Sequence, residues 1–182
     1  MHFPLKVSKA IQAIGVLFRH DRVDRMNYMR LLKLLYIADR ESLRETGRPI
    51  TGGPVVAMER GPVLEEVDAL IRGQHTEMPL WDEYLRKDRY NLELLKDPDV
   101  KQLSRYEIAK LQEVAKKHED DDEWALSRHT HDFPEWQKNQ AGASCRPIPL
   151  EDTLEAVGLG QAVPAITEEA RDVAFFDRLF GK

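Results

Sequence analysis

Residues 31–68 read LLKLLYIADRESLRETGRPITGGPVVAMERGPVLEEVD and decide the fold. The first part of this stretch is apolar around most of a helical circumference, which a globular protein tolerates only in a buried, central helix. Its apolar residues are Leu31, Leu32, Leu34, Leu35, Ile37 and Ala38. Gly47 and Pro49 follow as a capping glycine and a proline that cannot continue the helix. The stretch therefore predicts a central helix over residues 27–46, after a connector over residues 21–26.

The second part of the same stretch predicts a strand followed by another helix. Val55, Val56 and Met58 form a short apolar run that is typical of a strand. Gly61 and Pro62 then place a proline at a first helical position, with two glutamates in the turn that follows. The expected order is therefore helix, loop, strand and helix.

Helical spacing recurs along much of the remaining chain. An apolar face repeats through residues 4–20, so we expect a first helix there. Ser104 and Glu107 form a capping box, in which each side chain bonds the backbone N–H of the other residue, and the helix that they begin should end near His118. Shorter helices are predicted from residue 124, from Pro134 and over residues 151–157.

Strand signals are fewer and shorter. Residues 81–86 and 89–95 predict a hairpin around Lys87 and Asp88, which we expect to pair with the strand described above. Residues 141–149 are rich in glycine, proline and small side chains and predict a loop. The predicted fold class is α+β and mainly helical, with a small antiparallel sheet of about three strands.

The tail of the chain, residues 159–182, carries its own helix signals. Thr167 is a good N-cap, and Gly181 follows the last apolar residue. The apolar residues lie mostly three and four positions apart: Ala170, Val173, Phe175, Phe176, Leu179 and Phe180. Such a face must be covered. It either packs onto the domain over residues 1–158, which we favour, or meets a second subunit or another partner.

Length and charge restrict the class of protein. A chain of 182 residues suits one domain. Its net charge of −5 argues against a protein that binds nucleic acid through many phosphate contacts. Residues 1–60 carry 11 Lys and Arg against 6 Asp and Glu, a net +5, which leaves −10 for residues 61–182. The basic part would suit an acidic partner, or nucleic acid at low salt, although an ordinary solvated surface is the simpler interpretation.

We expect a cytoplasmic protein without membrane association. No run approaches the ~18 apolar residues that span a bilayer, and the N-terminal residues lack the apolar block of a signal peptide. Cys145 is the only cysteine, so no disulfide can form within the chain and a reducing compartment is permitted.

Four residues invite a metal or nucleophile interpretation: His118, His129, His131 and Cys145. Their spacing does not support it. Neither Cys-x-x-Cys nor His-Glu-x-x-His occurs, and His129 and His131 would point to sides of a helix about 200° apart. No motif activates Cys145 as a nucleophile. We therefore expect no metal, no cofactor and no catalytic residue.

Asp39 is the other residue that invites a catalytic interpretation. It lies beside Tyr36 on an apolar helix, where a carboxylate with a raised pKa could act as a general base. We favour a structural role, in which Asp39 accepts hydrogen bonds from backbone amides of the loop formed by residues 48–53, because buried polar groups nearly always have such partners. The glycines nearby also lack the spacing of a phosphate-binding loop.

Three separated segments carry a resemblance to a known family. They are KLLYIADRE over residues 33–41, GRPITGGPVVAMERGPV over residues 47–63 and LSRHTHDFPEW over residues 126–136. In this order they resemble the Panacea domain, the SocA-like antitoxin family often found beside toxin genes in bacteria and phages. The resemblance covers roughly residues 6–158. It implies a mainly helical fold with a small sheet and a protein that binds protein toxins rather than performing chemistry.

The resemblance and the side-chain types suggest two groups of site residues. The candidates for partner binding are Tyr36, Arg40, Arg60, His131, Phe176 and Phe180. The candidates for holding the motifs together are Asp39, Gly47, Pro49, Gly61, Pro62, Thr130 and Trp136. For Arg40, Arg60 and His131 a structural role is an equal alternative, and Trp124 and Trp136 are expected to fill the core.

The function that these observations favour is an antitoxin that neutralises a cognate toxin, encoded next door, by direct protein binding. One alternative is an adaptor that delivers a partner to a Clp-type protease, as one member of the family is understood to do. A second is a transcriptional regulator, although the apolar central helix does not look like a recognition helix. An enzyme is the weakest option, and a homodimer is left open.

Overall fold

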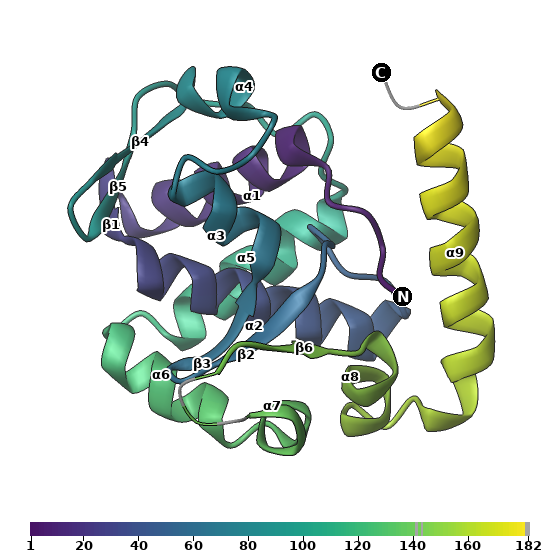
Figure 1. The fold of residues 1–182 in the computed structure, drawn as a ribbon. Helices are drawn as coiled ribbons and strands as arrows, with labels where there is room; N and C mark the ends of the chain where they lie inside the picture. The colour runs from purple at the N-terminus through teal and green to yellow at the C-terminus, as the bar shows by residue number, and fades with distance from the viewer. Residues whose placement is uncertain (141, 143, 181–182) are drawn as a thin grey trace.

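The computed structural model describes residues 1–140, 142 and 144–180 of the chain. These residues form nine α-helices and two small antiparallel sheets of three strands each (Figure 1). The predicted fold class, mainly helical α+β, is confirmed, but there are two small sheets instead of one. None of the described helices is both long enough and apolar enough to cross a membrane.

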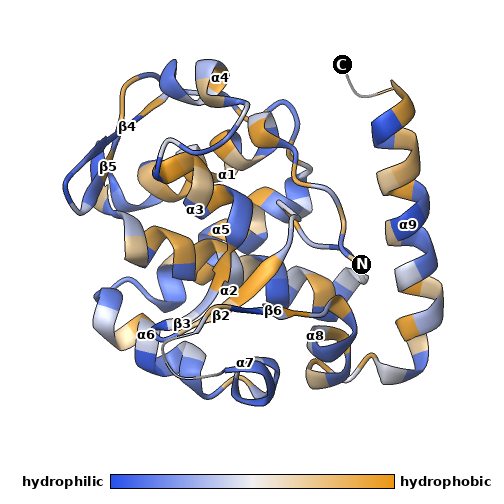
Figure 2. Ribbon diagram, in the orientation of Figure 1, coloured by the Kyte–Doolittle hydropathy of each residue, from blue (hydrophilic) through white to orange (hydrophobic). Residues whose placement is uncertain are grey.

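Helix α2 (Tyr28–Thr46) is the central element, as predicted. Asn27 caps its N-terminus, because the side-chain oxygen accepts hydrogen bonds from the N–H groups of Met29 (2.9 Å) and Arg30 (3.2 Å). Gly47 ends the helix in the left-handed conformation, with φ +75°. Figure 2 shows that α2 is largely hydrophobic, and it packs against α1 (Val7–Asp21), α5 (Arg105–Lys117) and α6 (Glu123–His131).

The other helices follow the predictions closely in most places. The capping box of Ser104 and Glu107 is present, and α5 ends at His118. The remaining elements are α3 (Glu65–Ile71), α4 (Met78–Asp82), α7 (Pro134–Asn139), α8 (Leu150–Ala156), the short 3₁₀ helix η1 (Gly160–Ala162) and α9 (Val163–Phe180).

The first sheet has the order β1-β5-β4 and contains the predicted hairpin. Its strands are β1 (Arg25–Asn27), β4 (Leu85–Asp88) and β5 (Asn91–Leu94). The prediction that the hairpin pairs with the Val55 strand is wrong: β5 pairs with β1, in a segment that we expected to be a connector. Buried Met26 lies opposite buried Leu92 in this pair, and a single buried position was too weak a strand signal. The turn lies at Arg89, with φ +54°, and Trp81 belongs to α4 instead of a strand.

The second sheet has the order β3-β2-β6 and corrects two predictions. Its strands are β2 (Val55–Met58), β3 (Gly61–Leu64) and β6 (Arg146–Ile148). Gly61 and Pro62 therefore lie in a strand and do not begin a helix, because Gly61 has φ +101° and β3 turns back directly along β2. The helix begins three residues after Pro62, at Glu65. Strand β6 lies in the region predicted as a loop.

Two hydrophobic clusters hold the molecule together. The large one surrounds α2, and the smaller one joins the N-terminal segment to α8 and α9. The smaller cluster consists of Phe3, Leu43, Leu154, Ile166 and Ala170. Figure 1 shows α9 running along one side of the molecule, near the N-terminus. The predicted division into residues 1–158 and a tail falls between α8 and η1 and stays a prediction.

Helix α9 begins four residues earlier than predicted, so Thr167 is not its N-cap. Instead the Thr167 hydroxyl donates to the carbonyl oxygen of Val163 at 2.7 Å, inside the first turn. The predicted end at Gly181 lies outside the described residues. Only Ile166 and Ala170 of α9 are buried, so the helix packs onto the domain through its first half.

Candidate functional site

A buried carboxylate joins the first and third motif segments. The side chain of Glu135 is 0% exposed and accepts hydrogen bonds from the Tyr36 hydroxyl (2.7 Å) and the Arg40 Nε (2.6 Å). The Arg40 guanidinium also lies 4.2 Å from the centre of the Phe133 ring. Burial and the neighbouring Glu135 raise the pKa of Tyr36 well above its usual value, so the hydroxyl stays neutral and donates. Tyr36 and Arg40 are thus fixed in place by internal contacts.

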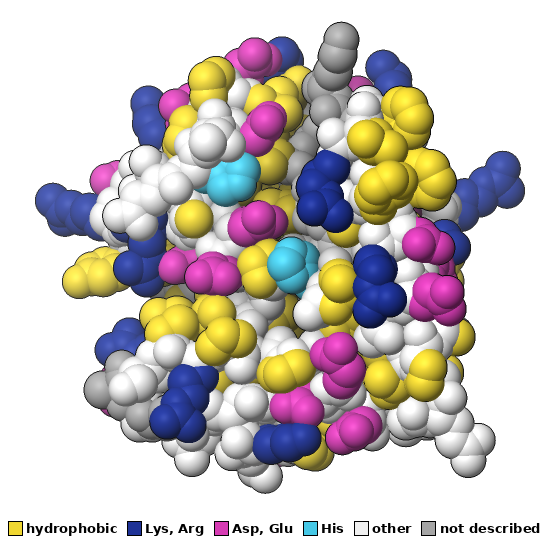
Figure 3. Space-filling model, turned by 45° about the vertical axis from the view of Figure 1, so that its right-hand side comes forward, with side chains coloured by type: hydrophobic (Ala, Val, Ile, Leu, Met, Phe, Trp, Pro, Cys, Tyr) yellow, Lys and Arg dark blue, Asp and Glu magenta, His cyan; other side chains and the backbone are white. Residues whose placement is uncertain are grey.

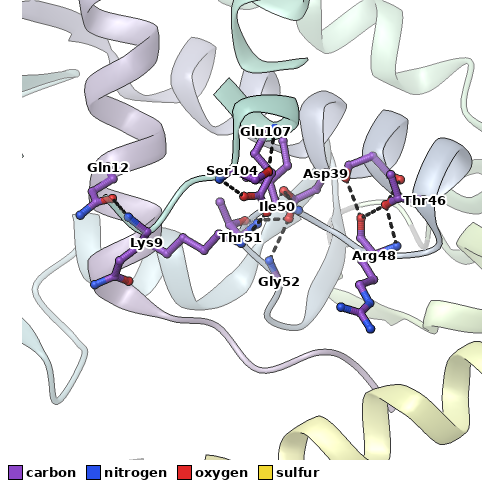
Figure 4. Close-up of polar contacts among 12 residues, drawn as sticks. Lys9, Gln12, Asp39, Thr46, Arg48, Ile50, Thr51, Gly52, Ser104 and Glu107 are labelled. Atoms are coloured by element: carbon purple, nitrogen blue, oxygen red, sulfur yellow. Dashed lines mark hydrogen bonds and ion pairs between the residues drawn. The ribbon is translucent and has the colours of Figure 1, made fainter. Parts of the chain in front are cut away.

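Asp39 fixes the loop of residues 48–53, as predicted (Figure 4). Its oxygens accept from the N–H groups of Ile50 (3.1 Å), Thr51 (2.9 Å) and Gly52 (3.0 Å), and from the Thr51 hydroxyl (2.7 Å). Burial raises the pKa of Asp39 to about 6, while these hydrogen bonds oppose the rise, so the group is ionised at neutral pH. Gly52 lets the loop approach the N-terminal segment, since a Cβ there would lie 2.8 Å from the Pro4 carbonyl oxygen.

A buried lysine brings together residues from all three motif segments. The Lys33 Nζ donates to the carbonyl oxygen of Pro62 at 2.8 Å. A Cβ on Gly61 would lie 2.4 Å from the Thr130 hydroxyl and 3.1 Å from the Lys33 nitrogen, so only glycine fits there. Burial lowers the pKa of Lys33 to about 7, against the opposing effect of Asp68. Gly61, Pro62 and Thr130, predicted to be structural, do lie at one packed junction.

Arg60 is exposed beside the turn between β2 and β3, and His131 lies half-buried nearby. The Arg60 guanidinium is 4.7 Å from the centre of the Trp124 ring. His131 stacks on Trp136, with ring centres 4.1 Å apart, and the Trp136 Nε1 donates to the Met58 carbonyl oxygen at 2.9 Å. Trp124 is 47% exposed, so the expectation that it fills the core is wrong. Its ring lies over an arginine at the surface, and Trp136 is only half-buried.

The candidate partner-binding residues therefore lie in three places. Tyr36 and Arg40 surround Glu135, Arg60 and His131 lie near the β2–β3 turn, and Phe176 and Phe180 lie on the exposed half of α9. A cavity of about 210 Å³ adjoins the first group. Prolines and aliphatic side chains make up much of its wall, including Pro49, Pro54, Pro147, Ile148 and Leu150. It can accept an apolar group more readily than a charged one.

His118 and His129 lie close together, whereas His131 stacks on Trp136. The His118 Nδ1 lies 2.7 Å from an Asp121 carboxylate oxygen, and its ring centre is 5.1 Å from that of His129. Burial, with a smaller effect of His118, lowers the pKa of His129. Cys145 is exposed. Among the residues that the structure describes, no three His, Cys, Asp or Glu side chains gather into a group that could hold a metal ion.

Two important residues were missed from sequence. Glu135 follows a proline at a helix start, where a glutamate is ordinarily explained by the helix dipole, so nothing marked it as buried. Lys33 carried a usable signal, since it is the single charged residue in the run LLKLLYIA. A lysine on a helix that is buried all round requires an internal acceptor.

Comparison with known proteins identifies the family. The model of the antitoxin SocA-like, Panacea domain matches residues 31–137, which is more than half of the chain. No curated protein and no solved structure gives a significant match. The match spans the central helix and the second motif segment and ends one residue after the third, so it includes Lys33, Asp39, Gly61 and Glu135. The chain therefore belongs to the SocA-like antitoxin family of Panacea-domain proteins.

Proposed function

We propose that this protein neutralises a protein toxin by binding it directly. The family match supports an antitoxin. The observation that carries direct binding is how the motif residues are used: Asp39 and Glu135 are satisfied by internal hydrogen bonds. Arginine and large aromatic side chains, which dominate the energetics of protein interfaces, are left at the surface, as Arg60 and Trp124 illustrate.

The same contacts support a binding protein over an enzyme. A general base needs a free lone pair within reach of a substrate proton. Both oxygens of Asp39 accept two hydrogen bonds each from the loop that it holds. Glu135 is enclosed by Tyr36 and Arg40. These carboxylates are suited to stabilising the fold.

The buried position of α2 argues against a transcriptional regulator of the helix-turn-helix kind. A recognition helix must lie exposed in the major groove. Helix α2 follows α1 through a short segment, but its residues Leu31, Leu34 and Leu35 are fully buried between other helices. The net charge of −5 also opposes binding to phosphates.

Co-expression with the neighbouring gene tests the proposal. Expression of the neighbour alone should arrest growth, and this chain should relieve the arrest and co-purify with the neighbour at a 1:1 subunit ratio or as a dimeric multiple of it. The negative control is the Glu135→Ala variant, which should fail to relieve the arrest because it loses the buried network that holds the third motif segment. A harmless neighbour, or toxicity that persists while both proteins are stable, would contradict the proposal.

The adaptor alternative predicts a different fate for the toxin. An adaptor shortens the half-life of its partner, whereas a binding antitoxin leaves the toxin intact in a complex. Pulse-chase measurement of the toxin, in cells with and without the Clp-type protease, separates these outcomes. We expect toxin levels that do not fall when this chain is present.

A further inference from the structure

A groove of about 540 Å³ lies between α9 and the loop of residues 48–53. Three parts of the chain form its walls: the N-terminal segment with the start of α1, the loop, and the middle of α9. The residues that line these walls include Pro4, Lys6, Lys9, Arg48, Ile50 and Val173. Its walls are therefore mixed, since apolar side chains alternate with cations and with the polar residues Thr51, Gln102 and Glu169.

The groove is preformed. Asp39 holds the loop from behind, through the backbone N–H groups of residues 50–52 (Figure 4). Lys9 forms an ion pair with Glu107 at 2.5 Å, which fixes the start of α1 against α5. Arg48 points from the loop toward α9, where it pairs with Glu169. A partner would thus meet a surface already in its binding shape, which limits the entropy cost of association.

An exposed apolar surface continues from the groove along α9. Val173 lines the groove, and the next turn begins an apolar end made up of Phe175, Phe176, Leu179 and Phe180. These four side chains are 50–75% exposed. Figure 3 shows hydrophobic side chains gathered at this end of the helix, with basic side chains beside them. An apolar surface of this kind usually marks an interaction site.

The area of the apolar end argues against a dimer of this chain that is paired through that end alone. Four such side chains expose on the order of 450 Å², since a whole aromatic side chain covers 150–250 Å². Two copies paired through this end alone would bury about 900 Å², below the roughly 1,200 Å² of a stable interface. A partner that fills the groove and covers the apolar end together would exceed that threshold.

Charge and spacing indicate what that partner is. Lys9 and Arg48 pair with Glu107 and Glu169, which leaves Lys6 as the cation of the groove wall that forms no ion pair with the residues that the structure describes. The apolar end repeats at four-residue intervals, Phe175 with Leu179 and Phe176 with Phe180. Side chains at this spacing form ridges that fit into the grooves of another helix.

We propose that the groove and the apolar end of α9 bind an acidic, amphipathic helix of the toxin. This inference rests on the proposed function. The family model matches residues 31–137, and α9 lies outside this range. The inference therefore assigns the scaffold to the shared domain and the selectivity for the toxin to α9. A helix lying in an apolar groove is a common mode of recognition between proteins.

Binding of the purified neighbouring toxin to four variants tests this inference. Phe176→Asp should weaken the Kd at least tenfold, on the order of an interface hot spot. Lys6→Glu should weaken it about three- to tenfold and reduce its salt dependence, as expected for a charge at the rim of an interface. Lys6 precedes α1 as its N-cap, where a glutamate is tolerated by the helix dipole, so folding is preserved.

The controls place the same changes on the opposite side of the molecule. Tyr90→Asp alters a 72% exposed aromatic in the β4–β5 turn, and Lys96→Glu alters an exposed lysine that follows β5. Both should bind the toxin as the wild type does. Circular dichroism melting of all four variants shows that each is folded.

Photo-crosslinking identifies the occupant directly. A benzoylphenylalanine at position 176 should label a helical toxin segment of net negative charge, and one at position 90 should label nothing in the complex. Unchanged binding by Phe176→Asp, or a cross-link from position 176 to a second copy of this chain, would contradict the proposed toxin-binding site. Either result would leave the proposed antitoxin function standing. A wild-type chain that binds no toxin would overturn the proposed function as well.

Discussion

The family-matched domain and helix α9 distribute polar and apolar residues in opposite ways. In the domain even charged groups are buried, and Glu135, Asp39 and Lys33 each have internal hydrogen-bond partners. In the second half of α9 phenylalanines face the solvent. These polar residues of the motifs serve the fold, whereas the longest run of exposed apolar side chains lies on α9, outside the matched region. Four predictions test how far this contrast holds.

The largest effect is expected at Glu135, where the domain is most dependent on an internal charge. Glu135→Ala leaves the Arg40 guanidinium and the Tyr36 hydroxyl without their partner, at a cost of about 3–5 kcal/mol in unfolding free energy. Urea denaturation measures it. Glu155→Ala, at a carboxylate whose side chain is largely exposed, is the control and should change stability little. A loss below about 1 kcal/mol at Glu135 would mean that the network is not integral to the domain.

Lys33 makes the stability of the domain depend on pH. The unfolded chain holds the Lys33 proton up to pH 10.5, whereas the folded chain releases it near pH 7. The unfolded state therefore binds more protons between these values, so the unfolding free energy contributed by this group rises with pH. Relative to Lys33→Met, the wild type should gain about 2–3 kcal/mol between pH 7 and pH 9, at up to 1.36 kcal/mol per pH unit. If the unfolding free energies of the wild type and Lys33→Met change equally with pH, Lys33 does not have the lowered pKa in the folded state.

Asp39→Asn tests whether the loop of residues 48–53 depends on a carboxylate. The amide would present donors to N–H groups that now donate to Asp39, and the loss of charge-assisted bonds should cost about 1.5–3 kcal/mol. Thermal melting measures this cost, and Asp82→Asn, at an aspartate on the exposed side of α4, serves as the control. A variant that melts at an unchanged temperature but no longer neutralises the toxin would show that Asp39 acts in toxin binding and not in holding the loop.

The smallest effect on stability is expected at the apolar end of α9. Phe176→Ser with Phe180→Ser should change the unfolding free energy by less than about 0.5 kcal/mol, because both side chains are exposed. Ile166→Ala, in the buried half of the same helix, should cost about 2 kcal/mol or more. Differential scanning calorimetry compares the two. Equal losses of unfolding free energy in the two variants would show that the end of α9 packs onto the domain. The domain and α9 would then not differ in how they distribute their apolar residues.

Local sequence signals predicted the helices well, but they did not predict which strands pair with one another. The capping box at Ser104, the glycine stop at Gly47 and the apolar run of α2 each act within a few residues, so each could be found from sequence. The partner of a strand is set by tertiary packing. Strand β2 pairs with β6 from 90 residues away, as the register of Val55 with Ile148 shows, and no local pattern marks such a choice.

The candidate site was predicted in part for the same reason. Asp39 and its loop are near in sequence, and their hydrogen bonds were predicted correctly. Glu135 meets Arg40 across a long sequence separation, so only the fold reveals the pair. Gly61 misled the prediction because glycine before proline is typical of a helix start, while its positive φ here serves the close approach to Thr130.

The smaller hydrophobic cluster has a consequence for the order in which the protein takes shape during translation. Phe3 emerges from the ribosome long before its contacts Ile166 and Ala170, with an interval of roughly 10–30 s at typical elongation rates. The domain around α2 can fold within that interval, while the groove still lacks its α9 wall. If the groove binds the toxin as proposed, the domain around α2 is folded before the molecule is able to neutralise, and its protective capacity is acquired only as α9 is synthesised.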